Sequence, residues 1–535
     1  MSILTIEGLT VALPAGADRP HAIEDVSLTV ERGEILCVVG ESGSGKSITA
    51  NAVMGLLPKS LPLRAGRLIL DGIDLRAQPP EAMRKLRGSR MAMIFQEPMT
   101  ALNPLMRVGD QIGEALAVHG APDRGRVQEL LAAVNLPDPV SIARSHPFRL
   151  SGGQRQRVMI AMALALEPAL LIADEPTTAL DVTTQMQILR LIREIQQRRG
   201  TGVLFITHDF GVVAEIADRV AVMQHGRIVE HGTAREVLDR PQHPYTRALI
   251  RAVPGFPKGG GVARAQGRDV LRVQGLEKTY HRGGWFSAGK MLRAVHDADF
   301  SLTRGETLGL VGESGSGKST LARCVVRLVT PEKGEIYFDG ADLRPLSRAA
   351  MKPFRRRVQM IFQDPYASLN PRRKVGEIIA EGPITHGTPR AEALERARDL
   401  LAIVRLDPGA MDRYPHEFSG GQRQRIGIAR ALAMKPELLI ADEPVSALDV
   451  SVQAEVLALL AEIREREKLT MLFITHDLRV AAQVCDRIAV MQRGAIVEQG
   501  PVGQVFANPA HPYTQQLLDS IPGRAWTPPD LGEAA

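Results

Sequence analysis

Short runs of consecutive apolar residues, each followed by a polar or glycine-rich stretch, dominate this chain. They include LLIAD at 170–174 and again at 438–442, VLFIT at 203–207 and MLFIT at 471–475. A run that is apolar at every position predicts a strand buried on both faces. Such strands, alternating with helices, are typical of an α/β fold whose sheet is covered on both sides.

Two other stretches, at about 100–150 and about 368–418, carry apolar residues at helical spacing and show few strand signals. The clearest example is AEALERARDLLAIV at 391–404. We therefore expect a small helical subdomain within each half of the chain.

The chain is an internal repeat. GESGSGKS at 40–47 returns unchanged at 312–319, and MIFQ[ED]P, SGGQRQR, LLIADEP, FITHD and HPYT each recur in the same order. A repeat of this length predicts two domains of one fold. A linker rich in glycine and basic residues is expected to join them flexibly. The expected boundaries are 1–254 for the first domain, 255–269 for the linker and 270–535 for the second domain.

Composition narrows the classes of protein that fit. Of 535 residues only 4% are aromatic, which disfavours a surface that stacks nucleic-acid bases. No apolar run is long enough to predict a membrane-spanning helix, and the first residues, MSILTIEGLT, do not predict a signal peptide. Cys37, Cys324 and Cys485 lie far apart, which predicts reduced thiols. The net charge of +6 is mild, and the densest basic run, 355–357, is interpreted as a solvated surface.

Each GESGSGKS copy fits the phosphate-binding pattern G-x-x-x-x-G-K-[ST], and each follows a predicted strand. Glycines let backbone N–H groups turn toward phosphates, the lysine adds a positive charge, and the serine hydroxyl can bind Mg²⁺. The residues expected to bind the nucleotide are Gly40, Glu41, Ser42, Gly43, Ser44, Gly45, Lys46 and Ser47 in the first half, and Gly312, Glu313, Ser314, Gly315, Ser316, Gly317, Lys318 and Ser319 in the second.

Each LLIADE run ends a predicted buried strand with two carboxylates. We expect Asp174 and Asp442 to bind Mg²⁺ together with the loop serines, Ser47 and Ser319. Glu175 and Glu443 come one residue later, where a carboxylate can orient or deprotonate the attacking water. The alternative is that one acid of each pair caps a helix or forms a salt bridge.

Two further polar residues follow predicted strands in each half. His208 and His476 come after VLFIT and MLFIT, at the carboxyl end of a strand, where α/β folds place ligand sites. We expect them to hydrogen-bond the γ-phosphate, and the alternative is a structural role. Gln96 and Gln363 follow the MIF runs and are expected to bind Mg²⁺ or the attacking water.

Together these motifs resemble those of the ATP-binding-cassette (ABC) ATPases. They occur twice in the family order and cover nearly the whole chain. The resemblance implies two tandem P-loop ATPase domains, each with a RecA-like core sheet, an antiparallel β part and a helical subdomain. It also implies that ATP and Mg²⁺ are the cofactors and that the chain hydrolyses ATP.

The SGGQ signature carries a further implication of the resemblance. In the family it contacts the γ-phosphate bound by the opposite cassette, so each half is expected to complete the other half's site. Asp181 and Asp449 match the family's loop that couples the two sites, and Phe418 stands where the family has leucine. The signature residues expected to bind nucleotide are Ser151, Gly153 and Gln154 in the first half, and Ser419, Gly421 and Gln422 in the second.

The family also places an aromatic ring beneath adenine. Tyr280 fits that position in the second half, whereas the matching residue in the first half is Leu13. We therefore expect ATP to bind the first site more weakly, by about 1 kcal/mol, the scale of an aromatic contact.

Q-[ED]-P followed by LNP, together with HPYT, resembles the ATPase subunits of dipeptide, oligopeptide and nickel importers. This implies uptake of peptides through two separate transmembrane permease subunits, served by an extracytoplasmic solute-binding protein. The chain would be peripheral, on the cytoplasmic face of the inner membrane, with no nucleic-acid partner. Some members carry a cysteine cluster for an iron–sulfur centre, but Cys485 stands alone, so no iron–sulfur cluster is expected.

Two other classes of protein remain as alternatives. One is a soluble twin-cassette ATPase that acts on ribosomes or nucleic acid, but the linker here is short and glycine-rich rather than long and helical. The other is an inactive scaffold, which is disfavoured because both halves retain the lysine, glutamate and histidine.

Overall fold

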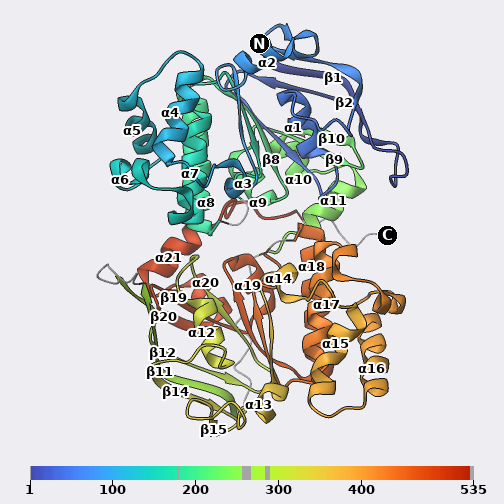
Figure 1. The fold of residues 1–535 in the computed structure, drawn as a ribbon, viewed down its shortest axis with the longest axis vertical. Coiled ribbons are helices and arrows are strands. Elements are labelled where there is room, and N and C mark those ends of the chain that lie inside the picture. Colours follow the sequence, from blue (N-terminus) through green and yellow to red (C-terminus); the bar gives the residue numbers. More distant parts are fainter. Residues whose placement is uncertain (1, 178–179, 256–266, 283–289, 447, 530–535) are drawn as a thin grey trace. The chain divides into compact units, whose positions relative to one another are not determined.

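The computed structural model describes residues 2–177, 180–255, 267–282, 290–446 and 448–529 (Figure 1). The chain divides into two compact units. The first comprises Met1–Leu180, Thr184–Val253 and Ile521–Ala535, and the second comprises Asp181–Thr183 and Pro254–Ser520. Most of the expected linker, 256–266, lies outside the described residues.

A six-stranded sheet forms the centre of the first unit, in the order β10–β9–β3–β8–β7–β6. All its neighbouring pairs are parallel except β9 with β10. Every residue of β3, β7 and β8 is buried, as their continuous apolar runs predict. The bounds are β3 (Ile35–Val39), β6 (Met91–Ile94), β7 (Leu170–Asp174), β8 (Gly202–Thr207), β9 (Arg219–Gln224) and β10 (Arg227–Thr233).

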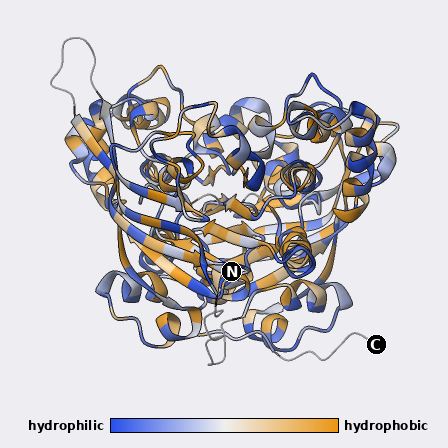
Figure 2. Cartoon of the chain, turned by 90° about the horizontal axis from the view of Figure 1, so that it is seen from below, coloured by the Kyte–Doolittle hydropathy of each residue, from blue (hydrophilic) through white to orange (hydrophobic). Residues whose placement is uncertain are grey.

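A four-stranded antiparallel sheet, in the order β2–β1–β4–β5, forms the second β layer of this unit. One hydrophobic core joins it to helix α1 (Lys46–Met54) and to a face of the six-stranded sheet, with Ile6, Val53 and Leu204 among its buried members. Figure 2 shows hydrophobic residues both on the strands and on the helices. The bounds are β1 (Ser2–Ala12), β2 (His21–Glu31), β4 (Leu63–Leu70) and β5 (Ile73–Asp74).

Helices make up the rest of the first unit. Those from α3 to α7 form the expected helical subdomain between β6 and β7 (Figure 1). The bounds are α1 (Lys46–Met54), α2 (Pro80–Leu86), α3 (Pro98–Ala101), α4 (Val108–Val118), α5 (Arg124–Ala133), α6 (Pro139–Arg144), α7 (Gly152–Ala163), α8 (Val182–Arg199), α9 (Phe210–Ile216), α10 (Ala234–Asp239) and α11 (Pro244–Arg251), with short 3-10 turns at Leu75–Ala77 and Pro147–Arg149.

The second unit repeats this architecture. Its sheets have the orders β12–β11–β14–β15 and β16–β17–β18–β13–β19–β20. The strands are β11 (Asp269–Arg282), β12 (Lys290–Thr303), β13 (Thr307–Val311), β14 (Lys333–Phe338), β15 (Ala341–Asp342), β16 (Val358–Ile361), β17 (Leu438–Asp442), β18 (Thr470–Thr475), β19 (Arg487–Gln492) and β20 (Ala495–Pro501). The helices are α12 (Lys318–Val325), α13 (Lys352–Arg357), α14 (Pro365–Ser368), α15 (Val375–Thr385), α16 (Arg390–Ile403), α17 (Gly420–Leu432), α18 (Val450–Glu467), α19 (Leu478–Val484), α20 (Val502–Ala507) and α21 (Pro512–Asp519), with 3-10 turns at Pro408–Asp412 and Pro415–Glu417.

The predicted α/β class, with a core sheet, an antiparallel β part and a helical subdomain in each half, is confirmed. The helix expected at 391–404 is α16, displaced by one residue. Within the described ranges, no helix combines the length and apolar character needed to cross a bilayer. Cys37, Cys324 and Cys485 are free thiols buried in the protein.

Candidate nucleotide site

Each phosphate loop joins a buried strand to a helix, β3 to α1 and β13 to α12, as predicted. Gly40 has φ 151°, and a Cβ there would lie 2.2 Å from the carbonyl oxygen of Met223. Gly312 stands in the same relation to Met491, with φ 149° and the same 2.2 Å distance. Only glycine therefore fits where each loop leaves its strand.

The loop lysines are buried and bonded to their own loops. The ammonium of Lys46 donates to the carbonyl oxygens of Gly40 at 2.6 Å and Glu41 at 2.8 Å. Lys318 makes the same two bonds in its own loop, both at 2.8 Å. Burial is the main cause that lowers the pKa of Lys318, although nearby carboxylates oppose it. The lysine thus stands inside the loop, where a phosphate can replace the carbonyl groups as its partner.

The serine and aspartate expected to bind a metal lie side by side in each unit. The hydroxyl of Ser47 donates to Asp174 Oδ1 at 3.0 Å, and Ser319 donates to Asp442 Oδ1 at 2.9 Å. Burial raises the pKa of Asp174 to about 6, while the bond from Ser47 acts in the opposite direction. Burial likewise raises the pKa of Asp442.

This donor set fits Mg²⁺. A hydroxyl, a carboxylate and the amide oxygen of the nearby glutamine are hard oxygen ligands, and Mg²⁺ usually combines one or two carboxylates with phosphate oxygens and water. Among the described residues, no group of three His, Cys, Asp or Glu side chains is arranged to hold a metal by itself. The serine and aspartate of each unit would leave the other coordination positions of Mg²⁺ to phosphate oxygens and water.

Glu175 is held by two partners at the end of β7. Gln96 Nε2 donates to Glu175 Oε2 at 2.9 Å, and His208 Nδ1 lies 3.3 Å from Glu175 Oε1. Glu175 has φ 48°, in the left-handed region, and its N–H donates to the carbonyl oxygen of Ile206 at 3.0 Å. For a residue other than glycine, a backbone conformation in this region costs about 1 kcal/mol of conformational energy. The turn directs the carboxylate toward the glutamine and the histidine.

The second unit reproduces this arrangement. Gln363 Nε2 donates to Glu443 Oε2 at 2.8 Å, His476 Nδ1 lies 3.2 Å from the same oxygen, and Glu443 has φ 47°. Burial acts to raise the pKa of Glu443, but the hydrogen bond and charge of His476 outweigh it, so the pKa is lowered. Burial acts to lower the pKa of His476, and Glu443 reverses this and raises it. The pair therefore favours a carboxylate beside an imidazolium.

The signature residues form the start of a helix in each unit. Ser151 caps α7: its hydroxyl accepts from Gln154 N at 3.2 Å, and Gln154 Oε1 accepts from Ser151 N at 3.0 Å. Ser419 and Gln422 form the same capping box at α17. The signature thus has a local structural role, and its expected contact with nucleotide remains a prediction.

The two units differ where adenine is expected. Tyr280 in β11 is 36% exposed, and the ammonium of Lys278 lies 5.3 Å from the centre of its ring. Leu13 instead packs, partly buried, against the hydrophobic core of the first unit. Arg19, which the sequence did not single out, donates to the carbonyl oxygen of Gly43 at 2.5 Å. The position expected beneath adenine therefore carries an aromatic ring in the second unit and leucine in the first.

Other predicted residues also have defined places. Asp181 directly precedes α8, and Asp449 directly precedes α18. Sequence reasoning missed the role of two tyrosines, Tyr245 and Tyr513, whose hydroxyls contact the phosphate loops. The sequence signal that points to them is the repeated HPYT motif, which contains both tyrosines.

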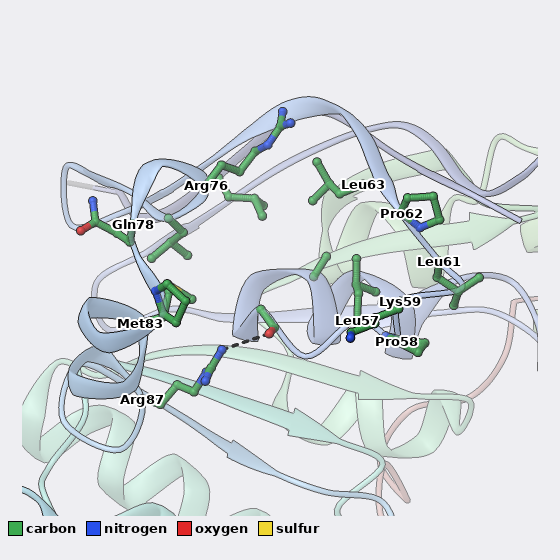
Figure 3. A pocket seen from close by; sticks show the side chains of 15 residues that line it. Leu57, Pro58, Lys59, Leu61, Pro62, Leu63, Arg76, Gln78, Met83 and Arg87 are labelled. Atoms are coloured by element: carbon green, nitrogen blue, oxygen red, sulfur yellow. Dashed lines mark hydrogen bonds between the residues drawn. The ribbon is translucent and has the colours of Figure 1, made fainter.

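A hollow of about 520 Å³ lies at the far end of α1 from the phosphate loop (Figure 3). Leu57, Leu61 and Met83 contribute to its apolar wall, and Arg87 lies at one side. Arg87 is already engaged, because it donates to the carbonyl oxygens of Met54 at 2.7 Å and Gly55 at 3.0 Å. No acidic side chain is among the described residues that line it, and we assign it no chemistry.

Two units of this fold, each with a glycine-rich phosphate loop, a paired aspartate and glutamate, and a helix-capping SGGQ signature, define a twin-cassette ATPase. A family model described as ABC transporter matches residues 23–178 and 295–446. The chain belongs to the ATP-binding proteins of the ABC transporter family, and it is an ATPase.

Comparison with individual proteins gives closer relatives. The chain is 47% identical to the Glutathione import ATP-binding protein GsiA of Salmonella typhimurium, covering 97% of this chain and 89% of the relative. The GsiA protein of Escherichia coli O157:H7 is also 47% identical, with 97% and 90% covered. A solved dimeric bacterial ABC transporter cassette is 28% identical, with a TM-score of 0.40, over 43% of this chain and 98% of that one.

The ends of both halves match a second family model. It is described as Oligopeptide/dipeptide transporter, C-terminal region, and it matches residues 229–277 and 497–527. Both matched ranges contain the HPYT motif, at 243–246 and 511–514.

Proposed function

We propose that this chain is the ATP-hydrolysing subunit of an importer for small peptides, with glutathione the first solute to test. The observation that carries this is the 47% identity to proteins named glutathione import ATP-binding proteins along nearly the whole chain. The matches to a peptide-transporter C-terminal region support the same solute class. The alternative, a soluble ATPase acting on ribosomes or nucleic acid, is not favoured by relatives that are named for import.

In this proposal the chain works with two transmembrane permease subunits and receives solute from an extracytoplasmic binding protein. It is peripheral on the cytoplasmic face of the inner membrane and is held there by the permeases. ATP binding drives the conformational change only to the extent that one state of the subunit binds ATP more tightly than the other.

The chain's own residues supply the chemistry of hydrolysis. Lys46 and Lys318 exchange their carbonyl partners for phosphate oxygens of ATP. Glu175 and Glu443 take a proton from water as its oxygen bonds to the γ-phosphorus and the bond to the bridging oxygen breaks, which releases ADP and phosphate. Mg²⁺, held by the serine and aspartate of each unit, would neutralise charge on the phosphates.

Gln96 and Gln363 are proposed to report the state of each site. Each follows an edge strand of its sheet, β6 or β16, and precedes the first helix of the helical subdomain. Each also holds the candidate catalytic glutamate through its amide. A nucleotide that displaces this bond would shift the start of the helical subdomain. The completion of each site by the other half's signature stays a prediction.

An uptake assay tests the proposal. Cells that lack this chain should lose accumulation of labelled glutathione, and the intact chain should restore it, whereas a Glu175→Gln, Glu443→Gln chain should not. A labelled tripeptide without the γ-glutamyl link, tested in parallel, separates a glutathione importer from a general peptide importer. Unchanged uptake of both solutes in cells lacking the chain would refute the peptide assignment.

A further inference from the structure

The HPYT motif connects the C-terminal region of each half to the phosphate loop of the same unit. The hydroxyl of Tyr245 accepts a hydrogen bond from the backbone N–H of Glu41 at 3.0 Å. The hydroxyl of Tyr513 accepts one from the N–H of Glu313 at 3.1 Å. The glutamate is the second residue of GESGSGKS in both cases. The two units thus share the same contact between equivalent residues.

The other residues of the motif fix the position of the tyrosine. His243 caps α11, because its Nδ1 accepts from Tyr245 N at 3.2 Å, and Pro244 follows at the first helical position, which suits proline. The carboxylate of Glu230 in β10 accepts from His243 N at 3.1 Å and from Gln242 N at 2.7 Å. The tyrosine therefore stands on a helix start that is tied to the sheet.

The second unit shows the same supports. His511 Nδ1 accepts from Tyr513 N at 3.1 Å, and the carboxylate of Glu498 accepts from His511 N at 3.0 Å and Ala510 N at 2.8 Å. Tyr513 is only 4% exposed. Burial is the main cause that raises the pKa of its hydroxyl to about 12, so the phenol stays neutral at physiological pH.

The tyrosine and the lysine hold opposite ends of one peptide group. In the peptide that joins Gly40 to Glu41, the carbonyl accepts from Lys46 and the N–H donates to Tyr245. When the lysine turns toward phosphate, the carbonyl loses that bond, and the tyrosine becomes the partner that keeps the peptide oriented. The same pair of bonds brackets the Gly312–Glu313 peptide.

We propose that Tyr245 and Tyr513 are positioning residues that hold the phosphate loops in shape when the loop lysines engage ATP. This proposal rests on the nucleotide site proposed above. In this role, the tyrosine hydroxyl of each HPYT motif links the C-terminal region of its half to the affinity of the phosphate loop for ATP.

The test compares Tyr245→Phe with Tyr513→Phe, singly and together, in the purified full chain. Phenylalanine keeps the ring and removes the hydroxyl that accepts the hydrogen bond from the loop. Loss of one hydrogen bond to the loop should raise the KM for ATP about 3- to 10-fold in the double variant, while kcat changes less than about twofold. The rise in melting temperature caused by MgATP should shrink, while the melting temperature without nucleotide stays close to that of the unchanged chain.

Three further variants separate the explanations. Tyr337→Phe removes a hydroxyl from β14 in the antiparallel sheet and should change neither constant. Tyr245→Ala with Tyr513→Ala removes the rings as well as the hydroxyls. If the hydroxyls determine the KM for ATP, the phenylalanine variants should show most of the rise in KM that the alanine variants show. Lys46→Ala with Lys318→Ala tests the site itself.

The outcomes are distinguishable. If the lysine variant loses ATP binding but the phenylalanine variants keep the KM of the unchanged chain, the tyrosine proposal is wrong and the nucleotide site stands. If the lysine variant also binds ATP normally, the site assignment fails. A fall in the nucleotide-free melting temperature with an unaltered KM would assign the tyrosines a purely structural role.

Discussion

Gln96 donates a hydrogen bond from Nε2 to Glu175 Oε2 at 2.9 Å, which joins the edge of the core sheet to the glutamate that follows its neighbouring strand. Gln363 and Glu443 repeat the bond at 2.8 Å. The glutamine also stands where the chain enters the helical subdomain. The candidate base is thus hydrogen-bonded to the residue after which the chain enters the helical subdomain.

Replacing both glutamates, Glu175→Gln with Glu443→Gln, should leave ATP affinity nearly unchanged and lower turnover by about 100-fold or more, because an amide cannot accept the proton from water. The measurement is phosphate release at saturating MgATP, beside equilibrium binding of ATP. The exposed Glu465→Gln on α18 serves as the matched control. A double variant with normal turnover would remove these residues from the chemistry.

The difference between Leu13 and Tyr280 predicts unequal adenine binding. Tyr280→Ala should weaken ATP binding at the second site by about 1 kcal/mol, or about fivefold, because an exposed aromatic platform is lost. Leu13→Ala should act on the first site through packing alone, since Leu13 lies against the core. Binding measured in a Lys46→Ala chain isolates the second site. Equal affinity with and without the Tyr280 ring would exclude stacking there.

The stability of the second unit should depend on the charge of Glu437. Its carboxylate accepts from Arg304 Nη1 at 3.1 Å and from Arg357 Nη2 at 3.0 Å, and the bonds from Arg357 are the main cause that lowers its pKa below 4.5. A lowered pKa means that the stabilisation is present above the unfolded value, near 4.5, and is lost as the pH falls through the folded pKa.

Glu437→Gln should therefore lower the free energy of unfolding of the second unit by about 0.5 to 1 kcal/mol at neutral pH, since solvent screens this partly exposed cluster. The difference from the unchanged chain should shrink as the pH is lowered through the acid range. Hydrogen exchange of β17 amides at a series of pH values measures this. If the difference in the free energy of unfolding does not change with pH, the loss of stability comes from the altered shape of the side chain and not from its charge.

Much of this architecture can be predicted from the sequence, because it depends on local patterns. LLIAD predicts β7 and β17 because a short run that is apolar at nearly every position is typical of a strand buried on both faces. The phosphate loops are equally explicit, because Gly40 and Gly312 occupy positions where any Cβ would meet a carbonyl oxygen. The hydroxyl and carboxylate chemistry of two motifs also predicts that Ser47 and Asp174 share a site, and a hydrogen bond joins them.

Local sequence patterns do not predict contacts between segments that are far apart in the chain. The sequence predicts a solvated surface at 355–357, and Arg355 and Arg356 are exposed whereas Arg357 is half-buried. Arg357 is bonded to Glu437, 80 residues away, and to Asp339. Tyr245 reaches Glu41 across 204 residues. No local pattern encodes such pairs, because they arise only when the sheet brings its strand ends together.

The most direct test of the account is the number of ATP molecules bound per chain. Equilibrium binding of MgATP to a chain carrying Glu175→Gln and Glu443→Gln, which prevents turnover, should give two ATP per chain. Adding either Lys46→Ala or Lys318→Ala should reduce this to one, and adding both should abolish binding. Two ATP molecules bound with both lysines removed would contradict the placement of the nucleotide in these loops.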